Sequence, residues 1–77
     1  MQRQFAEALP HFQKVIDDYP QSMKLPDALL KVGYCNYELR QWDAARTALE
    51  QVSRQFPDTT AARLATQRLE RMARESG

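Results

Sequence analysis

Cysteine, histidine and glycine are scarce in this chain of 77 residues, which contains one cysteine, one histidine and two glycines. A single cysteine, Cys35, allows no disulfide within the chain and no thiolate metal cluster, so we expect a small buried apolar residue there. No glycine-rich stretch has the pattern of a phosphate-binding loop, and no metal ligands stand at a recognisable spacing. We therefore expect neither a metal nor another cofactor.

The chain also lacks an excess of charge of either sign and any long hydrophobic run. Its 11 basic and 10 acidic residues give a formal net charge of +1, so it has no overall attraction to nucleic acid or to an anionic membrane. No run of about 18 apolar residues and no signal-peptide pattern is present. These residues are therefore not expected to enter a membrane or to direct export.

Apolar residues recur at steps of three and four positions along four segments, and no segment alternates as a strand would. This periodicity predicts an all-α fold of about four antiparallel helices. The first helix is expected at about residues 4–18, the second to end near Arg40, the third to run from Trp42 to Phe56, and the fourth to cover 60–75. The predicted core consists of Phe12, Leu29, Val32, Ala45, Leu49, Val52 and Leu69.

A short phrase occurs twice, as YPQS at residues 19–22 and as FPDT at 56–59, about 37 positions later. Recurrence at such a period indicates an internal repeat. Aligning the chain with itself at this shift pairs Arg3 with Arg40, Gln4 with Gln41, Phe5 with Trp42, Ala8 with Ala45, Phe12 with Leu49, Val15 with Val52 and Pro20 with Pro57. The sequence therefore predicts helix hairpins that repeat along the chain.

The repeated phrase marks the turn between one hairpin and the next. Its proline ends a helix because it cannot donate a backbone hydrogen bond and disfavours α geometry in the residue before it. We expect Ser22, and then either Thr59 or Thr60, to cap the helix that follows, with Pro26 near the start of the second helix. The aromatic residue before each proline is expected to fill the gap at the turn.

The register of the repeat predicts that a single domain, 1–77, begins half a repeat in. Residues 4–18 would be the second helix of one repeat, 23–56 a full repeat, and 60–75 a terminal capping helix. The apolar face of the first helix would then lack a natural partner, so a homo-oligomer formed through that face is one expectation.

Small and apolar residues of the repeat resemble the signature of the tetratricopeptide repeat family. The matching positions are Leu29, Val32, Gly33, Ala45, Leu49, Val52 and Pro57. The resemblance implies that a small residue stands where the two helices of a hairpin cross closely. The third unit departs from the pattern, because Glu70 stands at the position of Gly33 and Thr66 at that of Leu29. This favours a capping helix with a hydrated outer face.

A narrower resemblance covers almost the whole chain, with PDALLKVGY at 26–34, FPDT at 56–59 and AARLA at 61–65 as its clearest stretches. The chain resembles the C-terminal tetratricopeptide domain of the Tol-Pal system accessory proteins, the YbgF-type cell-division coordinators. That resemblance implies a periplasmic protein that binds TolA and coordinates septal peptidoglycan synthesis with outer-membrane constriction, with a peptidoglycan synthase as a further partner. Two alternatives are a scaffold of another envelope complex, such as an outer-membrane protein assembly lipoprotein, and a generic peptide-binding module.

Catalysis is not expected. His11, the one histidine, falls opposite much of the apolar stripe of the first helix, which favours a position in solvent over a role as a general base. No serine or cysteine nucleophile has a partner at a recognisable spacing. Asp17, Asp18 and Asp27 could be proposed as paired carboxylates, but Asp27 stands in the first turn of a helix, where its charge meets the positive end of the helix dipole.

Nucleic-acid binding is also not expected, although arginines concentrate on the fourth helix. Arg68, Arg71 and Arg74 recur at three-residue steps, which could form a phosphate track. Glu70 and Glu75 stand at spacings of four residues from Arg74 and Arg71, the usual arrangement of a solvated helix face.

Recognition of another protein through a concave groove is the function that helix-hairpin repeats predict. The first helix of each hairpin would line the groove, and Tyr34, Tyr37 and Arg71 are residue types favoured at interface hot spots. The two tyrosines could equally pack between helices. The predicted partner-binding groove consists of Asp27, Leu30, Tyr34, Tyr37, Glu38, Gln67, Arg71 and Arg74, with Leu64 beside them.

Overall fold

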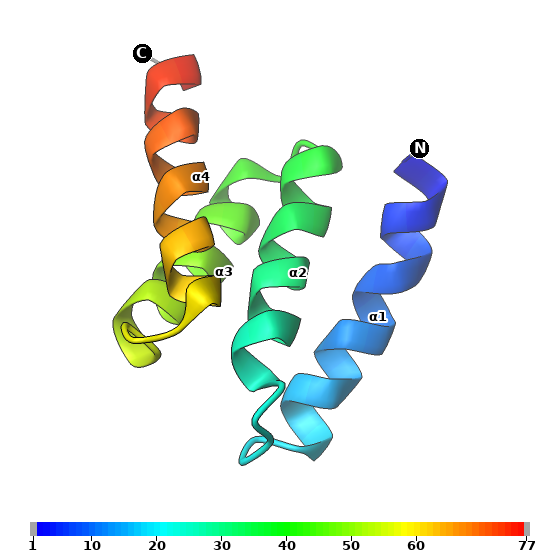
Figure 1. Cartoon of the computed structure of the whole chain (residues 1–77). Helices are drawn as coiled ribbons and strands as arrows, with labels where there is room; N and C mark the ends of the chain where they lie inside the picture. Colours follow the sequence, from blue (N-terminus) through cyan, green and yellow to red (C-terminus); the bar gives the residue numbers. More distant parts are fainter. Residues whose placement is uncertain (1, 77) are drawn as a thin grey trace.

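The computed structural model describes residues 2–76 of the chain, and the side chains of residues 4–75. These residues form four α-helices and no strand (Figure 1), which confirms the all-α prediction. The helices are α1 (Gln2–Asp18), α2 (Leu25–Glu38), α3 (Trp42–Gln55) and α4 (Thr60–Ser76).

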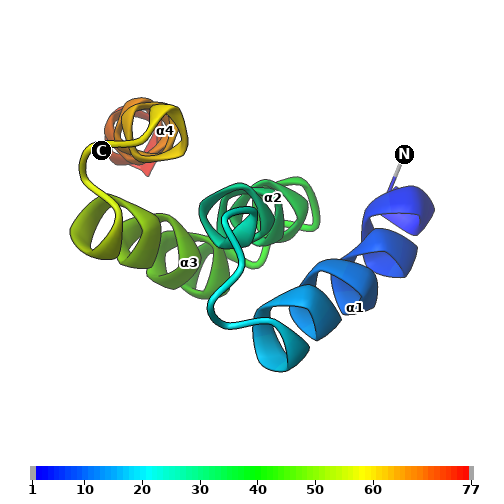
Figure 2. The ribbon, with the colours of Figure 1, turned by 60° about the horizontal axis from the view of Figure 1, so that its bottom comes forward.

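The four helices lie in two layers, with α2 at the centre. Figure 2 shows α2 and α4 in one layer and α1 and α3 in the other. The central helix, α2, packs against each of the other three, α3 also packs against α4, and α1 packs against α2 alone. The Cα atoms extend over 36 × 31 × 16 Å, so the molecule is a flat slab with two broad faces.

The hydrophobic core lies where α2, α3 and α4 meet. Of the predicted core residues, Leu29, Val32, Ala45, Leu49 and Val52 are buried, whereas Phe12 and Leu69 are only partly buried. The core cluster consists of Leu29, Leu30, Ala45, Leu49, Val52, Ala61, Ala62, Ala65 and Met72, with Ile16, Leu25, Tyr34, Tyr37, Phe56 and Leu69 packed against it.

Gly33 allows α2 and α3 to approach closely at their crossing. A Cβ atom on Gly33 would lie 2.6 Å from Cδ2 and 2.8 Å from Cγ of Leu49, and 3.6 Å from the carbonyl oxygen of Ala45. Distances below 3 Å leave no room for a methyl group, and Leu49 is itself fully buried. The sequence expectation of a small residue at this crossing is therefore confirmed.

The two aromatic residues that precede the turn prolines behave differently. Phe56 is partly buried against the core cluster, as predicted. Tyr19 is 63% exposed, so the prediction that it fills the gap at its turn is wrong. The connection between α1 and α2 spans residues 19–24, whereas that between α3 and α4 spans only 56–59. The longer connection lets Tyr19 point into solvent.

The same difference in length decides which hydroxyl group caps a helix. Thr59 Oγ1 accepts a hydrogen bond from the backbone N–H of Ala62 at 3.1 Å, so Thr59 rather than Thr60 caps α4. Ser22 does not cap α2, because that helix begins at Leu25 after Lys24, which has no side-chain cap. The Ser22 hydroxyl instead accepts from the N–H of Lys24 at 3.1 Å within the turn. Pro26 lies in the first turn of α2, as predicted.

α2 ends at Glu38, two residues before the predicted boundary at Arg40. Arg40 has φ 63°, the only non-glycine residue with positive φ among those described. The N–H of Gln41 bonds to the carbonyl of Asn36 at 2.8 Å, and the N–H of Arg40 to that of Tyr37 at 3.0 Å. These two bonds form a Schellman motif, which closes the helix and turns the chain into α3.

Candidate partner-binding groove

Aromatic and charged side chains of α2 and α4 contact one another and form a cluster between these two helices. We name it the tyrosine–arginine cluster: Tyr34 and Tyr37 from α2, with Arg68, Arg71 and Glu75 from α4. The guanidinium carbon of Arg68 lies 4.5 Å from the ring centroid of Tyr34 and 4.7 Å from that of Tyr37. Two aromatic rings thus hold one cation in place through cation–π contacts.

Tyr37 is the residue that joins the two helices most directly. Its hydroxyl donates a hydrogen bond to the Glu75 carboxylate. Its ring meets that of Trp42 edge to face, with centroids 5.3 Å apart and an interplanar angle of 73°. A tyrosine held at both its ring and its hydroxyl loses little further freedom when a ligand binds.

Glu75 accepts hydrogen bonds from two directions. In addition to the bond from Tyr37, its Oε2 lies 3.3 Å from Nε of Arg71, one turn earlier on α4. The hydrogen bond from Tyr37 lowers the pKa of Glu75, with Arg71 and Arg68 adding to the effect against an opposing contribution from desolvation. The same bond raises the pKa of the Tyr37 hydroxyl. The cluster is therefore arranged to hold a carboxylate in its charged form.

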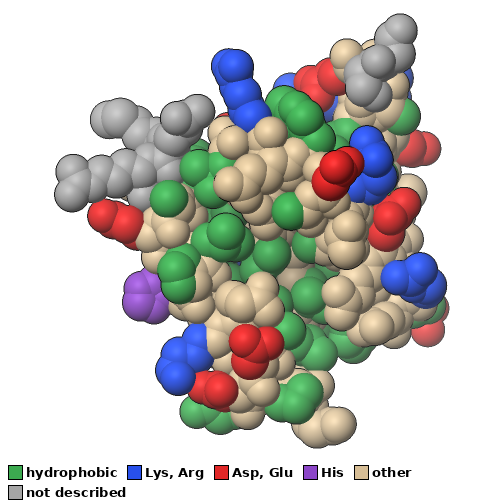
Figure 3. Space-filling view, turned by 180° about the vertical axis from the view of Figure 1, so that it is seen from behind, with side chains coloured by type: hydrophobic (Ala, Val, Ile, Leu, Met, Phe, Trp, Pro, Cys, Tyr) green, Lys and Arg blue, Asp and Glu red, His purple; other side chains and the backbone are tan. Residues whose placement is uncertain are grey.

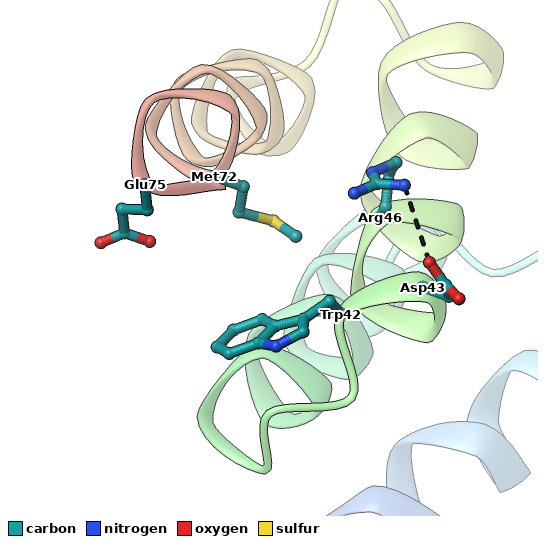
Figure 4. Close-up of a pocket in the computed structure, with 5 residues that line it drawn as sticks. All are labelled: Trp42, Asp43, Arg46, Met72 and Glu75. Carbon is teal, nitrogen blue, oxygen red and sulfur yellow. Dashed lines mark ion pairs between the residues drawn. The ribbon is translucent and has the colours of Figure 1, made fainter. Parts of the chain in front are cut away.

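A cavity of about 360 Å³ opens beside the cluster, between the start of α3 and the end of α4. Figure 4 shows Trp42 and Arg46 reaching into it from α3, and Met72 from α4. Asp43 pairs with Arg46 at 3.6 Å on its far rim, and Glu75 lines the near rim. Trp42 is 47% exposed, so the cavity has an accessible aromatic wall.

A second cavity, of about 320 Å³, lies between α1 and α2 and shares Tyr34 with the cluster. Phe5 and Phe12 form its wall on α1, and Lys31 and Cys35 line it from α2. At the shift of about 37 residues, Phe5 corresponds to Trp42 and Cys35 to Met72. The two cavities are therefore the same junction of consecutive helices in successive repeats, one on each side of the cluster.

The eight residues of the predicted groove differ in how much surface they offer. Tyr34 and Tyr37 are half-buried and Leu30 is only 6% exposed within the core cluster, so Leu30 presents almost no area to a partner. Asp27 stands in the first turn of α2 and Tyr37 in its last, so one groove contact would have to span the length of that helix. The exposed members are Asp27, Glu38, Gln67, Arg71 and Arg74.

The structure brings Tyr34, Tyr37 and Arg71 together and adds two residues that the predicted groove omitted, Arg68 and Glu75. The repeat contains the signal that would have found them, because at the same shift Arg68 corresponds to Lys31 and Glu75 to Glu38. Glu38 was placed in the groove, and its counterpart one repeat later was not. Arg68 was interpreted only as part of a solvated arginine face, whereas it is partly buried against two aromatic rings.

Residues considered for chemistry lie apart from the cluster. His11 is exposed, in agreement with its predicted position in solvent. Cys35 is buried, and burial raises the pKa of its thiol, with Lys31 acting in the opposite direction. Within residues 2–76, no group of histidine, cysteine and acidic side chains has the geometry to hold a metal ion. No helix in this range is long and apolar enough to cross a membrane.

The broad face seen from behind the view of Figure 1 also carries apolar side chains. Figure 3 shows hydrophobic side chains gathered in the hollow at the centre of this face, with charged side chains around its edges. The apolar stripe of α1 is only partly buried, since this helix packs against α2 alone. The partly buried members of the stripe are Phe5, Ala8, Leu9, Phe12, Val15 and Ile16.

A family model described as a tetratricopeptide repeat matches residues 1–69, a range that includes α1, α2 and α3 and more than half of α4. No curated protein and no solved structure matches the chain significantly.

Proposed function

The chain belongs to the tetratricopeptide repeat family, a family of protein-interaction modules, and from this premise we propose that it recognises a partner of the Tol-Pal machinery. In this proposal it is a non-catalytic module in the periplasm of a Gram-negative envelope. It binds TolA, and through this contact helps to coordinate septal peptidoglycan synthesis with outer-membrane constriction.

The tyrosine–arginine cluster is the observation that carries the proposal of recognition. It joins two aromatic side chains, Tyr34 and Tyr37, to arginines whose guanidinium groups are partly held in place. Tyrosine and arginine supply large contact area and directional hydrogen bonds, and they are enriched among the residues that dominate binding energy. The flanking cavities offer space for apolar side chains of the partner.

The choice of partner rests on sequence resemblance. The stretches at 26–34, 56–59 and 61–65 resemble the Tol-Pal accessory proteins, and the first of them contains Tyr34 and the close crossing at Gly33. A peptidoglycan synthase is a further candidate partner. A scaffold of outer-membrane protein assembly and a generic peptide-binding module are the alternatives that the experiment below separates from this proposal.

The test is calorimetric titration of the chain with the periplasmic helical region of TolA. We expect wild-type binding, and a loss of roughly tenfold or more in affinity when Tyr34→Ala and Tyr37→Ala are combined, which is the scale of an interface hot spot. Tyr19→Ala is the matched control, because Tyr19 is an exposed tyrosine in the turn after α1. It should leave the affinity unchanged.

Circular dichroism of the same variants distinguishes binding from folding. Helix content should be equal in the wild type, the double variant and the control. Parallel loss of helix content and binding in the double variant would show that the tyrosines act as core residues. A folded wild-type chain that does not bind TolA would refute the choice of partner and favour the alternatives.

A further inference from the structure

The Glu75 carboxylate occupies a position in the groove where a carboxylate of a partner protein could bind instead. It accepts hydrogen bonds from the Tyr37 hydroxyl and from Arg71, and it lies near enough to Arg68 for that charge to lower its pKa. Arg68 forms no ion pair with any described residue, and the rings of Tyr34 and Tyr37 hold its guanidinium beside this position. Two cations and a hydroxyl donor therefore converge on one carboxylate.

The Glu75 carboxylate can move away from these donors at a small cost in free energy. Glu75 lies in the last turn of α4 and is exposed to solvent. The terminal turns of helices open with little free energy, because their last carbonyls lack helical partners. A change of rotamer at Glu75, or fraying of this turn, would free the Tyr37 hydroxyl and Arg71 without disturbing the core.

The cavity next to this position supplies a second contact. Glu75 lines its rim, and Trp42 and Met72 form apolar walls within it. Figure 4 shows the Glu75 carboxylate pointing away from the Met72 side chain, so its departure would leave the cavity walls in place. A volume of about 360 Å³ falls within the range of roughly 300–1,000 Å³ that is usual for ligand pockets.

We propose that Glu75 is an internal competitor for a carboxylate site in the groove, and that the partner presents an acidic side chain next to a large apolar one. The partner's carboxylate replaces that of Glu75 beside Tyr37, Arg68 and Arg71, and its apolar side chain enters the cavity between Trp42 and Met72. This inference deepens the proposed function and rests on it, since it places the partner in the same groove. The competition lowers the affinity for acidic segments and favours those that fill the cavity as well.

The experiment uses a short synthetic peptide that repeats Leu-Glu-Glu, and a control peptide in which every Glu is replaced by Gln. Binding is followed by the fluorescence of Trp42, the single tryptophan of the chain, which lines the cavity. Glu75→Gln should bind the acidic peptide about three- to fivefold more tightly than the wild type, the range expected for removal of an exposed ion pair. The neutral peptide should bind the two proteins equally.

Two control variants, Glu70→Gln and Arg63→Gln, distinguish an effect of the carboxylate site from an effect of the net charge of α4. Glu70→Gln removes the same charge from an exposed position of α4 and should leave the affinity for the acidic peptide at the wild-type value. Arg68→Gln should weaken binding of the acidic peptide by about fivefold. Arg63→Gln, an exposed arginine near the start of the same helix, should leave it unchanged.

The inference is overturned if Glu75→Gln leaves the affinity for the acidic peptide unchanged or lowers it, if the two peptides bind alike, or if neither binds the folded Glu75→Gln variant. The proposed function would stand despite any of these outcomes if the chain binds TolA and this binding depends on Tyr34 and Tyr37. Failure of TolA to bind, together with selective binding of the acidic peptide, would instead refute the choice of partner and leave the carboxylate site standing.

Discussion

The backbone of Gly33 lies directly against the buried side chain of Leu49, with space for a hydrogen atom and none for a methyl group. This contact sets how closely α2 approaches α3, and with it the position of the α2 face that carries Tyr34 and Tyr37. A groove built on α2 therefore depends on packing at a residue that no partner can reach.

Gly33→Ala should lower the free energy of unfolding by about 1–3 kcal/mol, the usual cost of overpacking a core. The loss should appear although alanine favours helix over glycine by about 1 kcal/mol. Urea unfolding followed by circular dichroism measures it. Leu49→Ala alone should cost about 2–5 kcal/mol, and in that background Gly33→Ala should be neutral or stabilising. An equal cost of Gly33→Ala in both backgrounds would show that the contact with Leu49 is not its cause.

Thr59→Ala should destabilise the chain by about 0.5–2 kcal/mol, because Thr59 Oγ1 caps the first turn of α4. Thr60→Ala is the matched control, since Thr60 is already the first residue of the helix and exposed. Its effect should be within about 0.5 kcal/mol. Thermal unfolding of the two variants decides between them, and equal losses would argue against the assigned cap.

Pro10→Ala should stabilise the chain by about 1–3 kcal/mol, since Pro10 lies inside α1 and cannot donate the helical hydrogen bond to the carbonyl of Ala6. Pro57→Ala, the same change at an exposed turn position outside the helices, should bring no gain. Urea midpoints report both variants. If Pro57→Ala raises the stability and Pro10→Ala does not, the missing hydrogen bond at Pro10 does not destabilise α1 as proposed.

Tyr37→Phe should raise the pKa of Glu75 towards the usual glutamate value of about 4.3, because the hydrogen bond from Tyr37 is the largest cause of its lowering. Carboxyl carbon NMR titration measures this pKa. Tyr34→Phe is the control, because it removes the hydroxyl of the neighbouring ring that also contacts Arg68. It should leave the pKa of Glu75 unchanged.

The sign of the linked stability follows from the two shifts. The lowered pKa of Glu75 means that its contribution to folding is present above the unfolded pKa and is lost as pH falls through the folded value. The raised pKa of Tyr37 means that its contribution is present below the ordinary phenol pKa of about 10 and is lost as pH rises through the folded value. Tyr37→Phe should remove the dependence at high pH and reduce that at low pH, because Arg71 and Arg68 still lower the pKa of Glu75.

The positions of the helices could be predicted from the sequence, because apolar periodicity and proline determine the backbone conformation of residues close to them in the chain. The ends of the helices near Asp18 and Gln55, the cap at Thr59 and the crossing at Gly33 are all local or repeat-encoded. Ser22 and Tyr19 were predicted wrongly by treating the two turns as equivalent. The α1–α2 connection is longer, and the two extra residues move the serine away from the helix start and the tyrosine into solvent.

The site was predictable only in part, because its contacts join side chains far apart in the sequence. Tyr34, Tyr37 and Arg71 were placed in the groove from the helix register. Their contacts with Arg68, Glu75 and Trp42 depend on the angle and distance between α2 and α4 and on the turn that follows α2. That turn includes Arg40 with φ 63°, an uncommon conformation for arginine that the helical pattern does not predict.

The most direct test of the groove is an NMR titration of the isotope-labelled chain with the periplasmic helical region of TolA. The account predicts that chemical-shift changes gather on α2 and α4, at Tyr34, Tyr37, Gln67, Arg68 and Arg71. Shifts confined to α1 and α3, on the opposite layer, would contradict the groove as the binding surface. A folded chain whose spectrum does not change at saturating TolA would contradict the choice of partner.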